Sequence, residues 1–238
     1  YKGVERWVRI NPATTPYYHE DIRASIAGGC EGIRLPMTET KEEVEDVDRL
    51  ITEAEKEFGV EVGSTMIMAA IESPLGLINV YDICKASSRM MGVALSAGDF
   101  RRTMRATASE TGEELLFARS QILVAARAAG IMAFDTVNTN LDDFSYLRAE
   151  TELIKRLGFD GKSLISPKQI DIVHDIFTPT QKEIETAIHI VEGVKESAAA
   201  GVGVLIVDGQ MVDIAHVEGQ KRVLKLAKAA GVYKGDLV

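Results

Sequence analysis

Two acidic residues each follow an apolar run that is typical of a buried strand. Glu72 closes the run MIMAAIE, and Asp99 closes the run MGVALSAGD. In a parallel sheet covered by helices, ligands and catalytic groups gather at the carboxyl ends of the strands. Mg²⁺ commonly takes one or two protein carboxylates and completes its shell with water and substrate oxygens. Either residue alone could be structural, as a helix cap or a turn acid, but the pair favours a metal site.

Arginines accompany this acidic pair. Arg9 lies in the strand-like run WVRIN. A buried guanidinium is costly unless it is paired, so Arg9 is interpreted as a ligand of a substrate carboxylate, with an ion pair to Glu72 or Asp99 as the alternative. Arg34, in GIRLPM, has the same two interpretations, and neither is favoured.

A basic cluster follows Asp99. Arg101 and Arg102, with Arg105 close behind, are expected to form a loop on a chain of net charge −9. They predict contact with an anionic arm of the substrate, such as a phosphopantetheine or nucleotide phosphate, and a solvated loop is the alternative.

Lysine chemistry is less well supported by the sequence. A Schiff-base lysine needs a desolvated position near a strand terminus. Lys162 opens its predicted strand, and Lys168 lies in the helix after Ser166–Pro167. A metal is therefore favoured over a Schiff base.

The elements that must position these residues alternate between short apolar runs and helical patterns, as in a parallel sheet with right-handed crossovers. Helix starts are indicated by Ser73–Pro74 and Ser166–Pro167, and by three capping boxes, Thr40–Glu43, Thr111–Glu114 and Thr180–Glu183. The predicted strands are Trp7–Asn11, Gly32–Met37, Met66–Ser73, Met91–Gly98, Ala133–Asn138 and Lys162–Ser166.

The predicted fold class is α/β, a (β/α)8 TIM barrel. Six strand–helix units fill the barrel domain, residues 1–178, whereas a closed barrel needs eight. We expect two N-terminal βα units to be missing from this chain, which begins at Tyr1; an open doubly wound sheet is the alternative. Residues 179–238 are predicted to form a C-terminal helix–hairpin–helix extension with a turn at Asp208–Gly209.

Composition excludes several classes of protein. The 238 residues are 46% hydrophobic and carry a net charge of −9, which argues against a nucleic-acid surface. The two cysteines, Cys30 and Cys84, lack a CxxC partner and are interpreted as reduced, buried residues. No apolar run reaches the length of a membrane span and no signal peptide is indicated. We expect a soluble, cytoplasmic protein.

An ordered set of motifs resembles a known family. The chain is similar to the citrate lyase branch of the HpcH/HpaI aldolase–citrate lyase superfamily through essentially its whole length. The matching segments, in chain order, are VRIN, EGIRLP, GSTMIMAAIESPLG, ALSAGD, EELLFARSQILVAARAAGI, AFDTV and LGFDGKSLISPKQI.

The resemblance implies roles for individual residues. Glu72 and Asp99 match the family's Mg²⁺ ligands, so Glu72 would also contact substrate. Arg9 matches the arginine that holds a substrate carboxylate. Asp213 is on its own an acid in a hairpin, but it matches an acid that family members lend to a neighbouring protomer's site, where it would act as an acid/base.

The resemblance also implies an activity, namely Mg²⁺-dependent cleavage of a citryl thioester, on CoA or on an acyl carrier protein, to oxaloacetate and an acetyl thioester. The expected partners are the citrate lyase α subunit and acyl carrier subunit, in a homotrimeric barrel subunit. The alternatives are a lyase or thioesterase of malyl-CoA-type thioesters, and a non-catalytic barrel subunit that docks a carrier protein.

Overall fold

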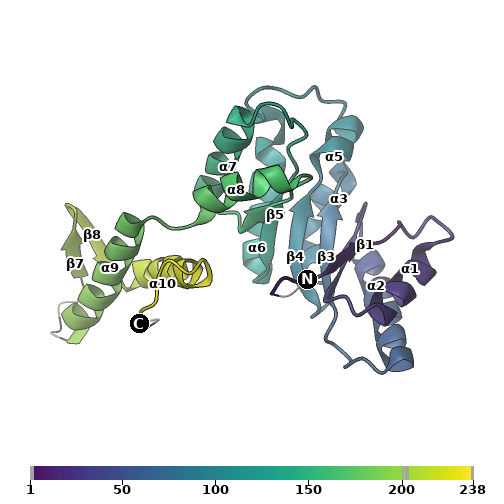
Figure 1. Ribbon diagram of the computed structural model, residues 1–238, viewed down its shortest axis with the longest axis horizontal. Coiled ribbons are helices and arrows are strands. Elements are labelled where there is room, and N and C mark those ends of the chain that lie inside the picture. Colours follow the sequence, from purple (N-terminus) through teal and green to yellow (C-terminus); the bar gives the residue numbers. More distant parts are fainter. Residues whose placement is uncertain (1–2, 200, 202–203, 237–238) are drawn as a thin grey trace. The chain divides into compact units, whose positions relative to one another are not determined.

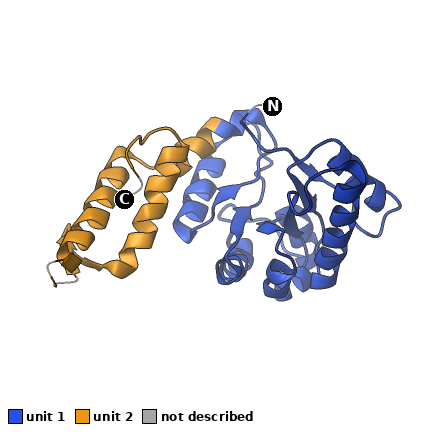
Figure 2. Cartoon of the chain, turned by 90° about the horizontal axis from the view of Figure 1, so that it is seen from below, with its two compact units in different colours: residues 1–170 blue, residues 171–238 orange. Residues whose placement is uncertain are grey.

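The computed structural model describes residues 3–199, 201 and 204–236. The chain divides into two compact units, Tyr1–Ile170 and Asp171–Val238, which are coloured separately in Figure 2. Each unit has its own helices, strands and apolar core, and each is described by itself below.

Unit 1 is built on a parallel sheet of six strands in sequential order (Figure 1). All six predicted strands are confirmed, and each ends earlier than predicted; at β3 and β4 this is because Ser73 and Ser96 already occupy the N-caps of the following helices. The strands are β1 (Trp7–Arg9), β2 (Gly32–Leu35), β3 (Met66–Ile71), β4 (Met90–Leu95), β5 (Met132–Asp135) and β6 (Gly161–Lys162).

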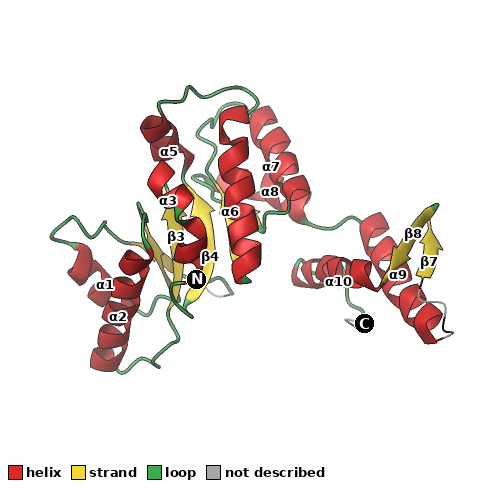
Figure 3. Cartoon of the chain, turned by 180° about the vertical axis from the view of Figure 1, so that it is seen from behind, coloured by secondary structure: helices red, strands yellow, loops and turns green. Residues whose placement is uncertain are grey.

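Helices follow the strands of unit 1 and cover one face of the sheet (Figure 3). Strand residues on this outer face, such as Ile33, Ile67 and Val93, are fully buried. The helical segments are α1 (Tyr18–Ala27), α2 (Lys41–Phe58), α3 (Pro74–Ile78), α4 (Val80–Lys85), α5 (Ala97–Met104), η1 (Glu113–Leu115), α6 (Leu116–Ala129), α7 (Ser145–Leu157) and η2 (Pro167–Gln169). The next helix, α8 (Ile170–Phe177), begins at the last residue of unit 1 and otherwise belongs to unit 2.

Local signals set most helix ends. Thr40 Oγ1 accepts the Glu43 N–H, and the Glu43 carboxylate accepts the Thr40 N–H at 3.0 Å, which confirms this capping box. Ser73 Oγ accepts the Gly76 N–H at 3.1 Å. The predicted box at Thr111–Glu114 is wrong. The Glu114 carboxylate instead accepts hydrogen bonds from Arg101 at 2.6 Å and from a serine hydroxyl, since a charged donor makes a stronger bond than a backbone N–H.

The sheet is curled, with a concave inner face opposite the helices. Arg34 on β2 donates hydrogen bonds to Ser163, just after β6, and to Ser96, just after β4, at 3.2 and 3.4 Å. In a flat sheet β2 and β6 would lie about 19 Å apart, far beyond the reach of one arginine. The curl is the curvature of a barrel wall and brings the inner-face side chains of distant strands together.

Two aromatic rings on the inner face pack against glycines of neighbouring strands. The Trp7 ring lies over Gly32 on the neighbouring strand, and the Phe134 ring lies between Gly92 and Gly161. A Cβ at Gly92 would stand 2.9 Å from the Phe134 ring. We call these five residues the floor of the inner face.

Unit 2 is a helix–hairpin–helix module with two small apolar clusters. After α8 it consists of α9 (Gln181–Ala199), β7 (Val204–Val207), β8 (Gln210–Asp213) and α10 (Ile214–Ala229). The predicted capping box of Thr180 and Glu183 is confirmed. So is the hairpin turn, where Asp208 and Gly209 both have positive φ, 49° and 77°, as a type I′ turn requires. Across the described residues, no helix is long and apolar enough to cross a membrane.

The two cysteines should differ in reactivity. Cys84 is buried on α4, and burial raises its thiol pKa to about 12, while Cys30 is only half-buried. Because the thiolate is the reactive form, we expect a disulfide reagent at pH 8 to label Cys30 first and Cys84 only on unfolding. The absorbance change on labelling measures both rates. In a urea-unfolded control, both thiols should react together. Equal rates in the folded chain would contradict it.

Candidate functional site

Glu72 lies directly after β3, at the carboxyl edge of the sheet. Its side chain is 8% exposed, and its Oε1 accepts the backbone N–H of Met37, after β2, at 3.1 Å. Burial raises the pKa of Glu72 above its ordinary value; the nearby charge of Asp99 adds to this, while the Met37 N–H and Arg34 oppose it. The positive charge near Glu72 is therefore too small to offset the burial of its ionised form.

Asp99 lies in the first turn of α5, not at a strand end as predicted. The correction follows from Ser96, which ends the extended backbone and occupies the N-cap, so that the helix begins at Ala97. Asp99 Oδ1 accepts two hydrogen bonds from Arg102, the shorter 2.7 Å, and this contact lowers the Asp99 pKa below its ordinary value.

The structure brings the two predicted carboxylates together. Glu72 and Asp99 lie close enough for each to shift the pKa of the other. Their oxygens are hard donors, and a buried carboxylate beside a second one is the arrangement that a divalent cation stabilises. Within the described ranges, no cluster of three or more His, Cys, Asp or Glu side chains could hold a metal ion. Two carboxylates are a number of protein ligands that Mg²⁺ commonly takes, with the other positions left to water and substrate.

Arg9 is exposed, so the expectation of a buried guanidinium is wrong. β1 pairs on one side only, with β2, and an edge strand leaves its side chains less covered. Arg9 is nevertheless at the site, because its charge acts on both Asp99 and Arg34. It is the register partner of Arg34, so the two guanidinium groups start from neighbouring positions on the inner face.

The predicted basic cluster is part of α5 and not a loop. Arg101 is half-buried and tied to Glu114 by an ion pair of 2.6 Å. Arg102 is exposed and paired with Asp99. Arg105 ends the helix with a positive φ of 57°. Two of the three arginines are thus engaged by carboxylates, one from α5 itself and one from η1.

Asp213 ends β8 in unit 2 and caps α10. Its Oδ1 accepts the Ala215 N–H and lies 2.9 Å from His216 Nδ1, and the His216 contact, with the Ala215 N–H, lowers the Asp213 pKa. The side chain is exposed and ionised at neutral pH. Its contacts within unit 2 are those of a helix cap.

The family model described as HpcH/HpaI aldolase/citrate lyase matches residues 1–167 of this chain. The chain belongs to this family. It is therefore an enzyme of the carbon–carbon lyase class.

Among relatives, the citrate lyase subunit beta of Leuconostoc mesenteroides subsp. cremoris is 50% identical over 229 residues, which cover 96% of this chain and 76% of that protein. A citrate lyase structure from Burkholderia xenovorans LB400 has the same fold at 20% identity, with a TM-score of 0.82 over 97% of this chain and 74% of that one. The citrate lyase beta subunit of M. tuberculosis, solved with oxaloacetate and magnesium, is 26% identical with a TM-score of 0.61 over 73% of each chain.

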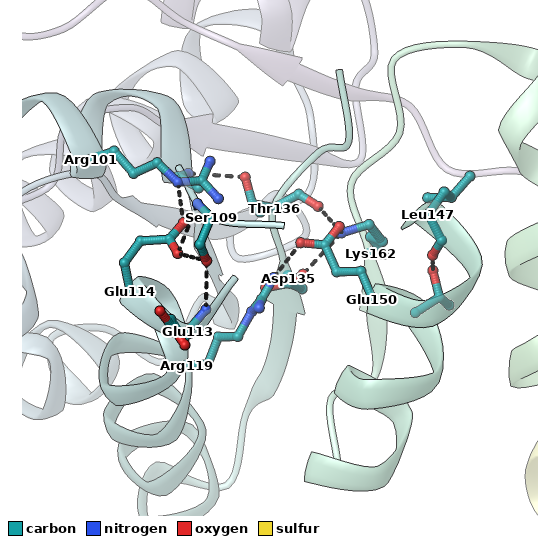
Figure 4. A network of polar contacts seen from close by, with 12 residues as sticks. Arg101, Ser109, Glu113, Glu114, Arg119, Asp135, Thr136, Leu147, Glu150 and Lys162 are labelled. Atoms are coloured by element: carbon teal, nitrogen blue, oxygen red, sulfur yellow. Dashed lines mark hydrogen bonds and ion pairs between the residues drawn. The ribbon is translucent and has the colours of Figure 1, made fainter. Parts of the chain in front are cut away.

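Arg119, the last residue of the EELLFAR motif, belongs to a buried ionic network that the sequence analysis does not predict (Figure 4). Arg119 on α6 binds Asp135 at 2.9 Å and Glu150 on α7, and Lys162 binds the same two carboxylates at 3.0 and 2.7 Å. The four side chains are buried on the outer face of the sheet. Lys162 is thus held between two carboxylates on the outer face, away from the inner face of the sheet.

Proposed function

We propose that this chain cleaves a citryl thioester to oxaloacetate and an acetyl thioester with bound Mg²⁺. The observation that carries the proposal is the pairing of Glu72 and Asp99 at the carboxyl edge of a curled parallel sheet. The 50% identity to a citrate lyase subunit beta supports the citryl group as substrate.

The reaction breaks the bond between the carbinol carbon and the methylene carbon next to the thioester. The carbinol hydroxyl loses its proton and becomes the ketone of oxaloacetate, while the bonding electron pair leaves with the methylene carbon as a thioester enolate. Mg²⁺ held by Glu72 and Asp99 would supply Lewis-acid stabilisation of the charge that develops on oxygen. Arg9 orients a substrate carboxylate, and Arg102 with Arg101 contacts the anionic arm of the thioester.

A proton must reach the methylene carbon to complete the acetyl thioester. We assign this transfer to Asp213, acting as the acid/base on the enolate carbon. Asp213 is ionised at neutral pH, so it would take up the proton that the carbinol hydroxyl loses and deliver it to the methylene carbon. Residues 179–238 would then form an extension that supplies Asp213 to a neighbouring protomer of a homotrimer.

The proposed architecture is the eight-stranded (β/α)8 barrel, of which β1–β6 form three quarters of the wall. The sequential strand order and the Arg34–Ser163 contact support this curvature. We propose that the enzyme works in the cytoplasm, on a thioester of CoA or of an acyl carrier subunit, beside a citrate lyase α subunit.

A thioester panel tests the function. The chain is incubated with citryl-CoA, malyl-CoA or β-methylmalyl-CoA, with Mg²⁺ or with EDTA, and the keto acid and free CoA are measured. We expect oxaloacetate from citryl-CoA only when Mg²⁺ is present. Keto acid from malyl-CoA alone, or free CoA without C–C cleavage, would assign the alternative thioester chemistry. Product from none of them, together with no Mg²⁺-dependent keto-acid binding, would indicate a carrier-docking subunit.

A further inference from the structure

Arg34 is a half-buried cation on the inner face without a carboxylate partner. Its two hydrogen bonds go to the neutral hydroxyls of Ser96 and Ser163. Among the described residues, no carboxylate lies within ion-pair distance of its guanidinium. Burial lowers the pKa of Arg34, and the more distant charge of Glu72 only partly offsets this. A guanidinium with five donors and two neutral acceptors has room for an anion.

The two hydroxyls fix where this cation points. Ser96 follows β4 and Ser163 follows β6, so Arg34 reaches from β2 across the concave face toward the far strands. Arg9 starts from the neighbouring register position on β1 but remains exposed at the edge. The inner face therefore carries two cations at different depths, one at the rim and one inside.

We propose that Arg34 binds the distal carboxylate of a four-carbon keto acid and so selects citryl over malyl thioesters. This inference rests on the proposed function. A citryl thioester has two free carboxylates, and a malyl thioester has one. Arg9 and Glu72–Asp99 with Mg²⁺ account for the first carboxylate, next to the reacting carbon. Arg34, on the same face and within the electrostatic reach of Glu72, matches the second.

Oxaloacetate and pyruvate separate the two carboxylates experimentally, because they share the keto-acid head and only oxaloacetate has the distal group. Calorimetric titration with Mg²⁺ measures the dissociation constant of each. We expect Arg34→Met to weaken oxaloacetate binding about 10- to 100-fold, the range for a lost hydrogen bond to a charged group. Pyruvate binding should change less than about threefold. Arg156→Met, on the exposed surface of α7, is the matched charge control and should change neither.

Ser163→Ala provides a second test that does not remove the arginine. Without its hydroxyl acceptor Arg34 is less well oriented, so oxaloacetate affinity should fall by about three- to tenfold, close to the net free energy of one hydrogen bond, with pyruvate unaffected. If Arg34→Met does not fold, Ser163→Ala still tests whether Arg34 binds the distal carboxylate. Equal losses for both keto acids, or an unchanged preference for oxaloacetate in both variants, would overturn the role of Arg34. A wild-type chain that binds neither keto acid with Mg²⁺ would overturn the proposed function itself, and this inference with it.

Discussion

A Glu72→Gln variant is expected to lose Mg²⁺-dependent cleavage of citryl-CoA by at least ~100-fold, since even the loss of a residue that only supports a metal ligand commonly costs 10–100-fold. Glutamine keeps the acceptor for the Met37 N–H but removes the charge that a cation needs. Asp99→Asn should have the same effect. Oxaloacetate production at saturating Mg²⁺ and calorimetric Mg²⁺ binding measure the loss.

Stability distinguishes this functional role from a structural one. Because burial raises the pKa of Glu72 in the folded chain, ionised Glu72 opposes folding at any pH above the ordinary carboxyl pKa. Glutamine removes this cost, so the free energy of unfolding should stay the same or rise while activity disappears. Glu45→Gln removes an exposed carboxylate of α2 and should alter neither quantity. Full activity in Glu72→Gln would exclude Glu72 as a metal ligand.

The second large effect is expected for Arg119→Met, which should lower the free energy of unfolding by about 3–5 kcal/mol. The substitution leaves Asp135 and Glu150 buried with Lys162 as their remaining cation. Urea unfolding followed by the fluorescence of Trp7, the chain's one tryptophan, reports on unit 1, where β1 and this network both lie. Arg49→Met breaks two exposed ion pairs on α2 and should cost no more than about 1 kcal/mol.

The loss in free energy of unfolding caused by Arg119→Met should depend on pH in a direction that follows from the pKa of Asp135. Burial disfavours the ionised form of Asp135, but Lys162 and Arg119 outweigh it and keep its pKa below the ordinary value. A depressed carboxyl pKa contributes stability above the unfolded-state pKa and loses it as pH falls through the folded-state value. Without Arg119 that contribution shrinks, so the deficit of the variant should be larger at pH 7 than at roughly pH 3, below the ordinary aspartate pKa. An equal deficit at both pH values would argue for lost packing alone.

Most of the fold could be predicted because its signals are local. Apolar runs mark the strands, and Thr40, Ser73 and Thr180 mark helix starts through hydrogen bonds to residues three positions away. The prediction at Thr111 failed for a long-range reason. Arg101 and Ser109 compete for the Glu114 carboxylate, and a pattern of spacing within a capping box does not include competitors from another helix.

The site could be predicted only in part. The apolar run before Glu72 correctly predicts its place at a strand end, whereas the similar run before Asp99 predicts a strand edge for a residue that belongs to a helix. Exposure was harder to infer than position, as Arg9 shows, because it depends on which strands flank β1. The contact partners of Arg119 and Arg34 lie up to 129 positions away from them in the sequence. Only the curl of the sheet and the packing of the helices bring them together.

The floor of the inner face also limits how this family member can diverge. A Cβ at Gly32 would overlap the Trp7 ring, and one at Gly92 would stand 2.9 Å from the Phe134 ring. Neither glycine can acquire a side chain unless the ring on the adjacent strand moves or becomes smaller, and a smaller ring alone leaves a void. A deeper or shallower inner face therefore requires two substitutions together, one at the glycine and one at the ring on the neighbouring strand. A relative that accepts an acyl group of another size by this route should differ at both positions.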